Sequence, residues 1–354
     1  MLLTKMTLPL KQLTLNDNNL KNRGAQQVAQ YLTTNTTLSE LSLASNDIDR
    51  IGIDKLTTSF KLNTSLQTLN LHNNKLAFKG TEVLCSFLAT NTTIRSVTLS
   101  GNGIGLKGAT FIGACLAQNS RLTYLNVNKN SLTDANLTPL FEGIEKNKSL
   151  LHLHLKDNEL CILSNFGKAI LQSNLRTFNA ANNHINITEI AIFFQKFNQY
   201  HSNLNSFLLK NNRGVDTIWH RLSLRTLPDS IDKFLQNNSF LTDLSLPQSG
   251  PIWEKVQPVL QARMAERGRL LSVEWTRKIH LLQEEMRVRV LEIFLVIDDK
   301  MVARDVKILI ISYFILLTYH PKKYLQAPFP TRKYTNAKFF LQDQQTSAVG
   351  GNLK

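Results

Sequence analysis

The sequence predicts an α/β repeat protein in which each successive unit contains a strand, a turn and a helix. Its clearest feature is the pattern L-x-x-L-x-L-x-x-N-x-L, which recurs at a constant interval along the first half of the chain. Regular copies begin at Leu10, Leu38, Leu66, Ile94, Leu122 and Leu150. Less regular copies begin at Leu175, Leu204 and Leu241, and the last has Ser249 in place of the asparagine. Self-similarity at a fixed period of this length is typical of a solenoid.

Each unit opens with an expected strand and continues into an expected helix. In the first copy, Leu13 and Leu15 alternate with polar residues at period two, as in a strand with one buried face. The segments 24–35, 80–91 and 108–119 place apolar residues at helical spacing after a glycine. The helices are therefore expected to follow Gly24, Gly52, Gly80 and Gly108.

A register of asparagines marks the turn of each unit. A buried amide both donates and accepts hydrogen bonds, so one asparagine per unit satisfies backbone groups that the bend leaves unpaired. We interpret the register as a buried structural ladder. Its members are Asn18, Asn46, Asn74, Asn102, Asn130, Asn158, Asn183 and Asn212. Three N-x-[ST] sequons, at Asn35, Asn63 and Asn91, recur with the same period, which assigns them to the corner between helix and strand rather than to glycosylation.

These residues closely resemble the leucine-rich repeat family, and the 28-residue unit with a helical return is similar to the cytosolic ribonuclease-inhibitor type. The resemblance covers roughly residues 8–250. It implies a curved solenoid, or horseshoe, with a parallel concave sheet and convex helices. With strands about 4.8 Å apart, nine strands span about 38 Å, enough to hold a protein partner. One departure is an insertion at 213–230, which lengthens the interval before Leu241.

The predicted domains divide near residues 250 and 320. Residues 1–250 are the expected solenoid of about nine repeats. Residues 251–320 lose the leucine pattern and predict an α-helical C-terminal extension, either a cap for the last repeat or a small domain. Residues 321–354 predict a flexible basic tail, with weak contact to an anionic membrane as an alternative to a solvated tail.

Composition and motifs exclude several functional classes. The net charge is +15, and its density after residue 250 is about twice that before it. Three cysteines offer no disulfide framework, and an export signal is not expected, so the sequence favours a cytoplasmic protein. Phosphate-binding glycine loops and the G-x-S-x-G, H-E-x-x-H and C-x-x-C motifs are absent from the sequence. We therefore expect no catalytic residues, no cofactor and no small-molecule substrate, and we do not expect nucleic acid as the partner.

The variable strand positions indicate where a partner binds. Most are small and neutral, but larger groups gather in the fifth and sixth repeats. The predicted partner-binding residues are Tyr124, Asn126, Asn128, Lys129, His152, His154 and Lys156. His152 and His154 share one strand face, as in a partial zinc site, but His72, three repeats away, lies about 14 Å off at strand spacing, so no metal is expected.

Together these features predict a non-enzymatic scaffold that binds a protein of unknown identity on its concave face. The abundance of Asn, Lys, Thr and Ile is similar to that of leucine-rich-repeat effectors which intracellular bacteria inject into host cells. A host protein in the host cytosol is then the expected partner. The alternative is a regulator of a small GTPase, similar to the leucine-rich GTPase-activating proteins, although those typically carry an acidic C-terminal tail and this one is basic.

Overall fold

The computed structural model describes residues 9–212, 227–238, 241 and 243–246. The predicted C-terminal extension (251–320) and basic tail (321–354) lie outside these residues. Nine strands form one parallel sheet in chain order. They are β1 (Gln12–Thr14), β2 (Glu40–Ser42), β3 (Thr68–Asn70), β4 (Ser96–Thr98), β5 (Tyr124–Asn126), β6 (His152–His154), β7 (Thr177–Asn179), β8 (Ser206–Leu208) and β9 (Asp243–Ser245). This arrangement confirms the predicted parallel sheet of an α/β solenoid.

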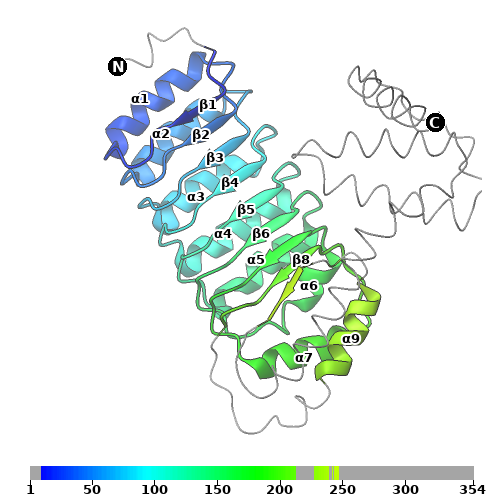
Figure 1. Cartoon of the computed structure of the whole chain (residues 1–354). Coiled ribbons are helices and arrows are strands. Elements are labelled where there is room, and N and C mark those ends of the chain that lie inside the picture. The colour runs from blue at the N-terminus through cyan, green and yellow to red at the C-terminus, as the bar shows by residue number, and fades with distance from the viewer. Residues whose placement is uncertain (1–8, 213–226, 239–240, 242, 247–354) are drawn as a thin grey trace, which may run out of the picture. The chain divides into compact units, whose positions relative to one another are not determined.

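The helices form a second layer behind the sheet, as Figure 1 shows. They are α1 (Lys21–Thr34), α2 (Arg50–Phe60), α3 (Ala77–Leu88), α4 (Gly105–Gln118), α5 (Asp134–Lys146), α6 (Gly167–Gln172), α7 (Ile187–Phe197) and α9 (Leu227–Asn237). Neighbouring helices pack about 8–10 Å apart, whereas neighbouring strands lie about 4.8 Å apart. The layer of helices is therefore longer along the solenoid axis than the sheet. This difference bends the solenoid, with the sheet on the inner, concave side.

The helices begin earlier than the sequence predicts, because the glycines lie inside the first turn rather than before it. A Cβ atom at Gly108 would lie 2.3 Å from Ile104 Cγ2, and one at Gly24 would lie 2.5 Å from Leu20 Cβ. A larger residue at Gly24 or Gly108 would collide with the apolar side chain four residues earlier, Leu20 or Ile104. Glycine therefore allows the first turn of the helix to pack against that side chain.

Repeat length varies in the second half of the solenoid. The strand registers pair Tyr124 with His152, His152 with Thr177 and Thr177 with Ser206. The interval from β6 to β7 is therefore shorter than the regular one, and the interval from β7 to β8 is slightly longer. The short repeat has a helix of only six residues, α6.

The insertion predicted at 213–230 lies mostly outside the described residues. Its last four residues belong to α9, which begins at Leu227. The insertion was therefore predicted too long at this end. The helix that follows it packs against α7, so the chain returns to the repeat pattern before β9.

One continuous apolar core lies between the sheet and the helices. The middle residue of most strands is buried, including Leu41, Leu69, Val97 and Leu125. Toward the C-terminal repeats phenylalanine replaces leucine, and rings from the sheet and from α7 and α9 contact one another in tilted and edge-to-face pairs. Their centroids lie 5.1 to 6.3 Å apart in the pairs among Phe178, Phe193, Phe194, Phe207 and Phe234.

The register of asparagines forms a hydrogen-bonded ladder between repeats. Asn158 is typical: its Nδ2 donates to Val127 O (3.2 Å) and Leu155 O (2.8 Å), and its Oδ1 accepts from the N–H groups of Asn130 (2.9 Å) and Leu132 (3.1 Å). The ladder asparagines from Asn46 to Asn212 are buried. Asn18 departs from the predicted buried ladder, because its side chain is exposed and its Nδ2 bonds to Asn16 O of the same turn.

A second asparagine row holds the corner between helix and strand. The Asn63 Oδ1 accepts from Ser65 N and Leu66 N, and its Nδ2 reaches back to Leu32 O (3.0 Å) in the preceding repeat. Asn119 and Asn147 bond in the same way. The sequons therefore belong to a longer row of structural side chains, Asn35, Asn63, Asn91, Asn119 and Asn147.

Candidate functional site

The sheet brings the largest side chains of its concave face together at β5 and β6. Tyr124 pairs in register with His152, and Asn126 pairs with His154. Leu125 lies between Tyr124 and Asn126 and is buried in the core. Because successive side chains of a strand point to opposite faces, Tyr124, Asn126 and both histidines project from the concave face.

The ring of Tyr124 lies against both imidazoles. Its centroid is 5.1 Å from that of His154 and 6.3 Å from that of His152, with interplanar angles of 41° and 43°. All three side chains are half-buried. An aromatic ring held by neighbouring rings loses little further entropy when a partner covers it.

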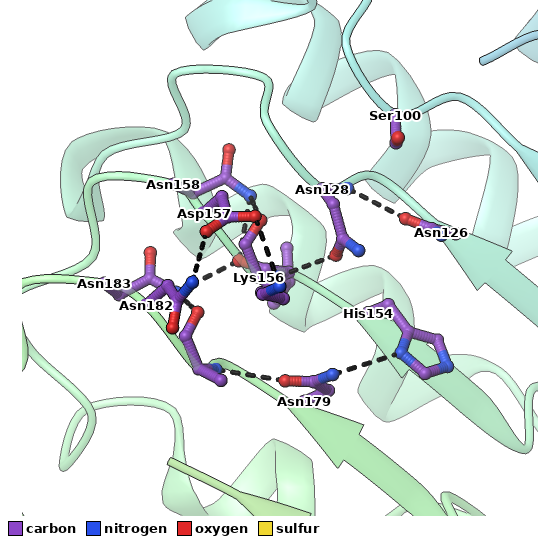
Figure 2. A network of polar contacts seen from close by, with 12 residues as sticks. Ser100, Asn126, Asn128, His154, Lys156, Asp157, Asn158, Asn179, Asn182 and Asn183 are labelled. Atoms are coloured by element: carbon purple, nitrogen blue, oxygen red, sulfur yellow. Dashed lines mark hydrogen bonds and ion pairs between the residues drawn. The ribbon is translucent and has the colours of Figure 1, made fainter. Parts of the chain in front are cut away.

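His154 is fixed by an asparagine of the next strand. Its Nδ1 lies 3.4 Å from Asn179 Nδ2, and Asn179 Oδ1 accepts a 3.1 Å hydrogen bond from Ala181 N. That second bond orients the amide with its NH₂ group toward the imidazole, as Figure 2 shows. Nδ1 then acts as the acceptor, and the proton of the neutral ring lies on Nε2.

The surroundings of His154 also favour its neutral form. Burial lowers the pKa of His154, and the neighbouring charge of His152 lowers this pKa further. His152 Nδ1 lies 3.0 Å from Thr177 Oγ1 on β7. One strand, β7, therefore orients both rings, and at neutral pH the His154 ring offers an N–H donor to a ligand.

The predicted residues Asn126 and Asn128 take part in bonds of the fold. Asn126 Oδ1 accepts from Asn128 N (3.0 Å), and Asn128 Oδ1 accepts from Lys156 N (2.8 Å) in the next repeat. These bonds hold the amides at the rim of the aromatic cluster. Asn126 and Asn128 thus shape the surface and also carry backbone hydrogen bonds, a role the strand pattern alone does not reveal.

Lys129 and Lys156 lie where the two strands leave the sheet. Lys129 is exposed and has a left-handed backbone, with φ of 53°. The Lys156 ammonium lies 3.6 Å from Asp157 Oδ2, and Asn182 Nδ2 donates to Asp157 Oδ1 at 2.7 Å. Figure 2 shows this chain of polar contacts beside His154 and Asn179. The charge of Asp157 is therefore already compensated from two sides.

The histidine pair has no third ligand for a metal ion in the part of the chain that the structure describes. No group of three His, Cys, Asp or Glu side chains there could hold a metal. His72 Nδ1 instead lies 2.6 Å from Ser100 Oγ in its own part of the sheet. Among the same residues, no helix has the length and hydropathy of a membrane span.

One family model matches two short segments of the chain. The model of the family described as "Leucine Rich repeat" matches residues 34–56 and 90–113, which span β2 with most of α2 and β4 with most of α4. The fold is a leucine-rich-repeat solenoid. No curated protein matches the chain in sequence.

Three solved structures are similar to this solenoid. Actin-binding site 2 of leiomodin-1 is 19% identical, with a TM-score of 0.35 over 41% of this chain and 86% of that one. The tropomodulin C-terminal domain of Caenorhabditis elegans is 16% identical, with a TM-score of 0.34 over 41% and 87%. The TLR13 chain in its complex with ssRNA13 is 19% identical, with a TM-score of 0.43 over 67% of this chain and 32% of that one.

The solenoid adds four residues that the sequence analysis did not select. Thr177 and Asn179 orient the histidines, and Asp157 with Asn182 holds Lys156. Thr177 and Asn179 occupy the same pattern positions as His152 and His154, one repeat later. Parallel strands in register place equivalent positions of neighbouring repeats side by side. The sequence signal for Thr177 and Asn179 is therefore their position in the repeat, which is the same as that of His152 and His154.

Proposed function

We propose that this leucine-rich-repeat solenoid is a non-enzymatic scaffold which binds a protein partner on its concave face. The binding surface is centred on Tyr124, His152 and His154 and is bordered by Asn126, Asn128, Lys129 and Lys156. The observation that carries this proposal is the contact of Tyr124 with both imidazoles, in which three large side chains form one half-buried patch. Tyrosine-centred patches of this kind supply much of the energy of protein interfaces.

The rest of the concave face supports the same location. The corresponding positions on β3 and β4 are Thr68, Asn70, Ser96 and Thr98, which present less area for contact. On β7 and β8 the corresponding positions are Thr177, Asn179, Ser206 and Leu208, which are neutral and contain no aromatic ring. A partner that follows the sheet therefore meets its only cluster of rings among these strands at β5 and β6.

A role as an injected bacterial effector that meets a host protein rests on the composition of the chain, and regulation of a small GTPase is the alternative. The membrane contact predicted for the basic tail concerns residues outside the described part of the chain.

Capture of the partner tests the binding surface. The full-length protein and its Tyr124→Ala/His152→Ala/Lys156→Ala variant are used as baits in eukaryotic cytosol, and bound proteins are identified by mass spectrometry. A matched control variant, Thr68→Ala/Ser96→Ala/Thr98→Ala, alters the same face on β3 and β4. The wild type and the control should capture one common protein that the first variant loses, with unchanged circular dichroism spectra for all three.

Each result of this experiment separates the alternatives. Equal capture by the wild type and the Tyr124 variant moves the site away from the concave face of β5 and β6. A small GTPase as the common protein supports the alternative function, and an unrelated protein supports the scaffold.

A further inference from the structure

Positive charge is concentrated where the middle strands of the sheet end. Across β4 to β8 and the turn that follows each strand, at residues 96–102, 124–130, 152–158, 177–183 and 206–212, the charged residues other than histidine are three lysines and one aspartate. They are Lys129, Lys156, Lys210 and Asp157. The acidic strand residues lie farther out, with Glu40 on β2 and Asp243 on β9.

Asp157 offsets one of the three lysine charges, which leaves a net charge of +2 in these ranges with the histidines neutral. Its carboxylate accepts from Asn182 Nδ2 at 2.7 Å and faces the Lys156 ammonium at 3.6 Å. Its side chain is 24% exposed, compared with 40% for that of Lys156. A ligand that approaches the face therefore meets the ammonium group more than the carboxylate.

Lys129 occupies a position where the backbone favours other residues. The residue before each ladder asparagine has a positive φ in every described repeat from the first to the eighth. These residues are Asp17, Ser45, Asn73, Gly101, Lys129, Asp157, Asn182 and Asn211. All except Lys129 have a short side chain or none, as is usual in left-handed turns. The left-handed turn itself therefore does not explain the long cationic side chain of Lys129.

The aromatic cluster adds directed donors to this charge. The His154 ring is held with its proton on Nε2, and Tyr124 supplies a hydroxyl group beside it. Lys129 and Lys156 lie at the exits of the same two strands. Hydrogen-bond donors and ammonium groups thus converge on one region, and carboxylates are the side chains that accept from both.

We infer that the partner presents an acidic, extended segment to the concave face between β5 and β8; this rests on the proposed function and names the chemistry of the partner. From β5 to β8 the strands span about 14 Å, which about four or five residues of an extended peptide cover. Nucleic acid fits the surface less well, since duplex-binding proteins commonly neutralise about 6–10 phosphates and this face offers three lysines.

Binding of a short acidic peptide tests the inference. Hexaglutamate is titrated into the full-length protein while the amide and imidazole signals are followed by NMR. The wild type should show saturable shifts at the β5 and β6 residues, and raising the salt concentration should weaken binding. The variant Lys129→Gln/Lys156→Gln should bind about tenfold more weakly, as expected for the loss of two exposed ion pairs.

A matched variant distinguishes local charge from net charge. Lys55→Gln/Lys146→Gln removes two exposed lysines from α2 and α5 and should bind hexaglutamate like the wild type. Equal weakening in both double variants, no saturable shifts in the wild type, or tighter binding of hexauridylate than of hexaglutamate would each overturn the inference.

The same variants separate this inference from the proposed function. If Lys129→Gln/Lys156→Gln still captures the protein that the Tyr124→Ala/His152→Ala/Lys156→Ala variant loses, the binding surface stands and the acidic partner is rejected. If both variants lose it while Lys55→Gln/Lys146→Gln retains it, the acidic partner is supported.

Discussion

Asn158 accepts, through Oδ1, a hydrogen bond of 2.9 Å from the backbone N–H of Asn130, the ladder residue one repeat earlier. Asn130 in turn accepts from Asn102 N at 2.9 Å. Each amide therefore joins its own repeat to the one before it. The solenoid depends on this chain because buried backbone groups at the turns would otherwise lose their partners.

Replacing a central ladder residue should destabilise the solenoid. Asn130→Ala leaves Leu99 O and Asn102 N without the amide that bonds them, and we expect it to lower the free energy of unfolding by about 1–3 kcal/mol. Asn18→Ala is the control, because this side chain is exposed at the first repeat and should change the free energy by less than about 0.5 kcal/mol. Urea denaturation measures the free energy of unfolding of both variants. Equal midpoints for Asn130→Ala and the wild type would contradict the structural role of the ladder.

The contact between α4 and α5 should tolerate no side chain at its glycines. A Cβ atom at Gly113 would lie 2.1 Å from Pro139 O, and one at Gly143 would lie 2.2 Å from Gly113 O. Gly113→Ala should therefore cost about 2–3 kcal/mol, since the helices must move apart. At Gly103 a Cβ meets no atom within 4 Å, so Gly103→Ala should cost only the backbone strain of about 1 kcal/mol. A smaller loss for Gly113→Ala than for Gly103→Ala in thermal unfolding would refute this reading of the contact.

Substitutions at Lys129 should separate stability from binding. Lys129→Gly relieves the left-handed backbone and should stabilise the fold by about 1 kcal/mol, whereas Lys129→Ala keeps the strain and should leave stability nearly unchanged. Both remove the charge, so both should weaken hexaglutamate binding. Denaturation and NMR titration check the two effects, and unaltered binding in both variants would show that the ammonium takes no part in recognition.

The stability of the solenoid should fall in mild acid because of His154. Its pKa is lowered in the folded state, so below about pH 6.5 the unfolded chain binds more protons at this site and unfolding becomes easier. The groups that face the ring are Tyr124 on β5, His152 on β6 and Asn179 on β7. Unfolding midpoints from about pH 7.5 to 5 should decline less steeply in His154→Asn than in the wild type. His184→Gln, at an exposed histidine, is the control and should keep the wild-type slope. An identical slope in His154→Asn would show that another group is responsible.

The fold could be predicted from the sequence because its strongest determinants are local and periodic. Leu13 and Leu15 in the first unit, with their equivalents in later units, specify which face of each strand is buried. The asparagine register follows from the same period. Helix starts were less well predicted, because the close approach of Gly108 to Ile104 depends on three-dimensional packing.

The candidate site was predictable in position but not in detail. Tyr124 and His152 could be placed side by side, since the interval between their repeats is regular. The partners Thr177 and Asn179 follow the histidines sooner than the regular period predicts, because α6 is short. The left-handed backbone of Lys129 was visible in principle, since the equivalent positions hold Asp, Asn, Ser or Gly.

Hydrogen–deuterium exchange of the complex with the captured protein tests the central claim most directly. Mass spectrometry compares amide exchange in the free and bound solenoid, peptide by peptide. Binding on the concave face predicts protection that is greatest in peptides covering 122–131 and 150–158, with little change in peptides from α4 and α5. Protection that is greatest in the helical peptides, with β5 and β6 unchanged, would contradict the claim.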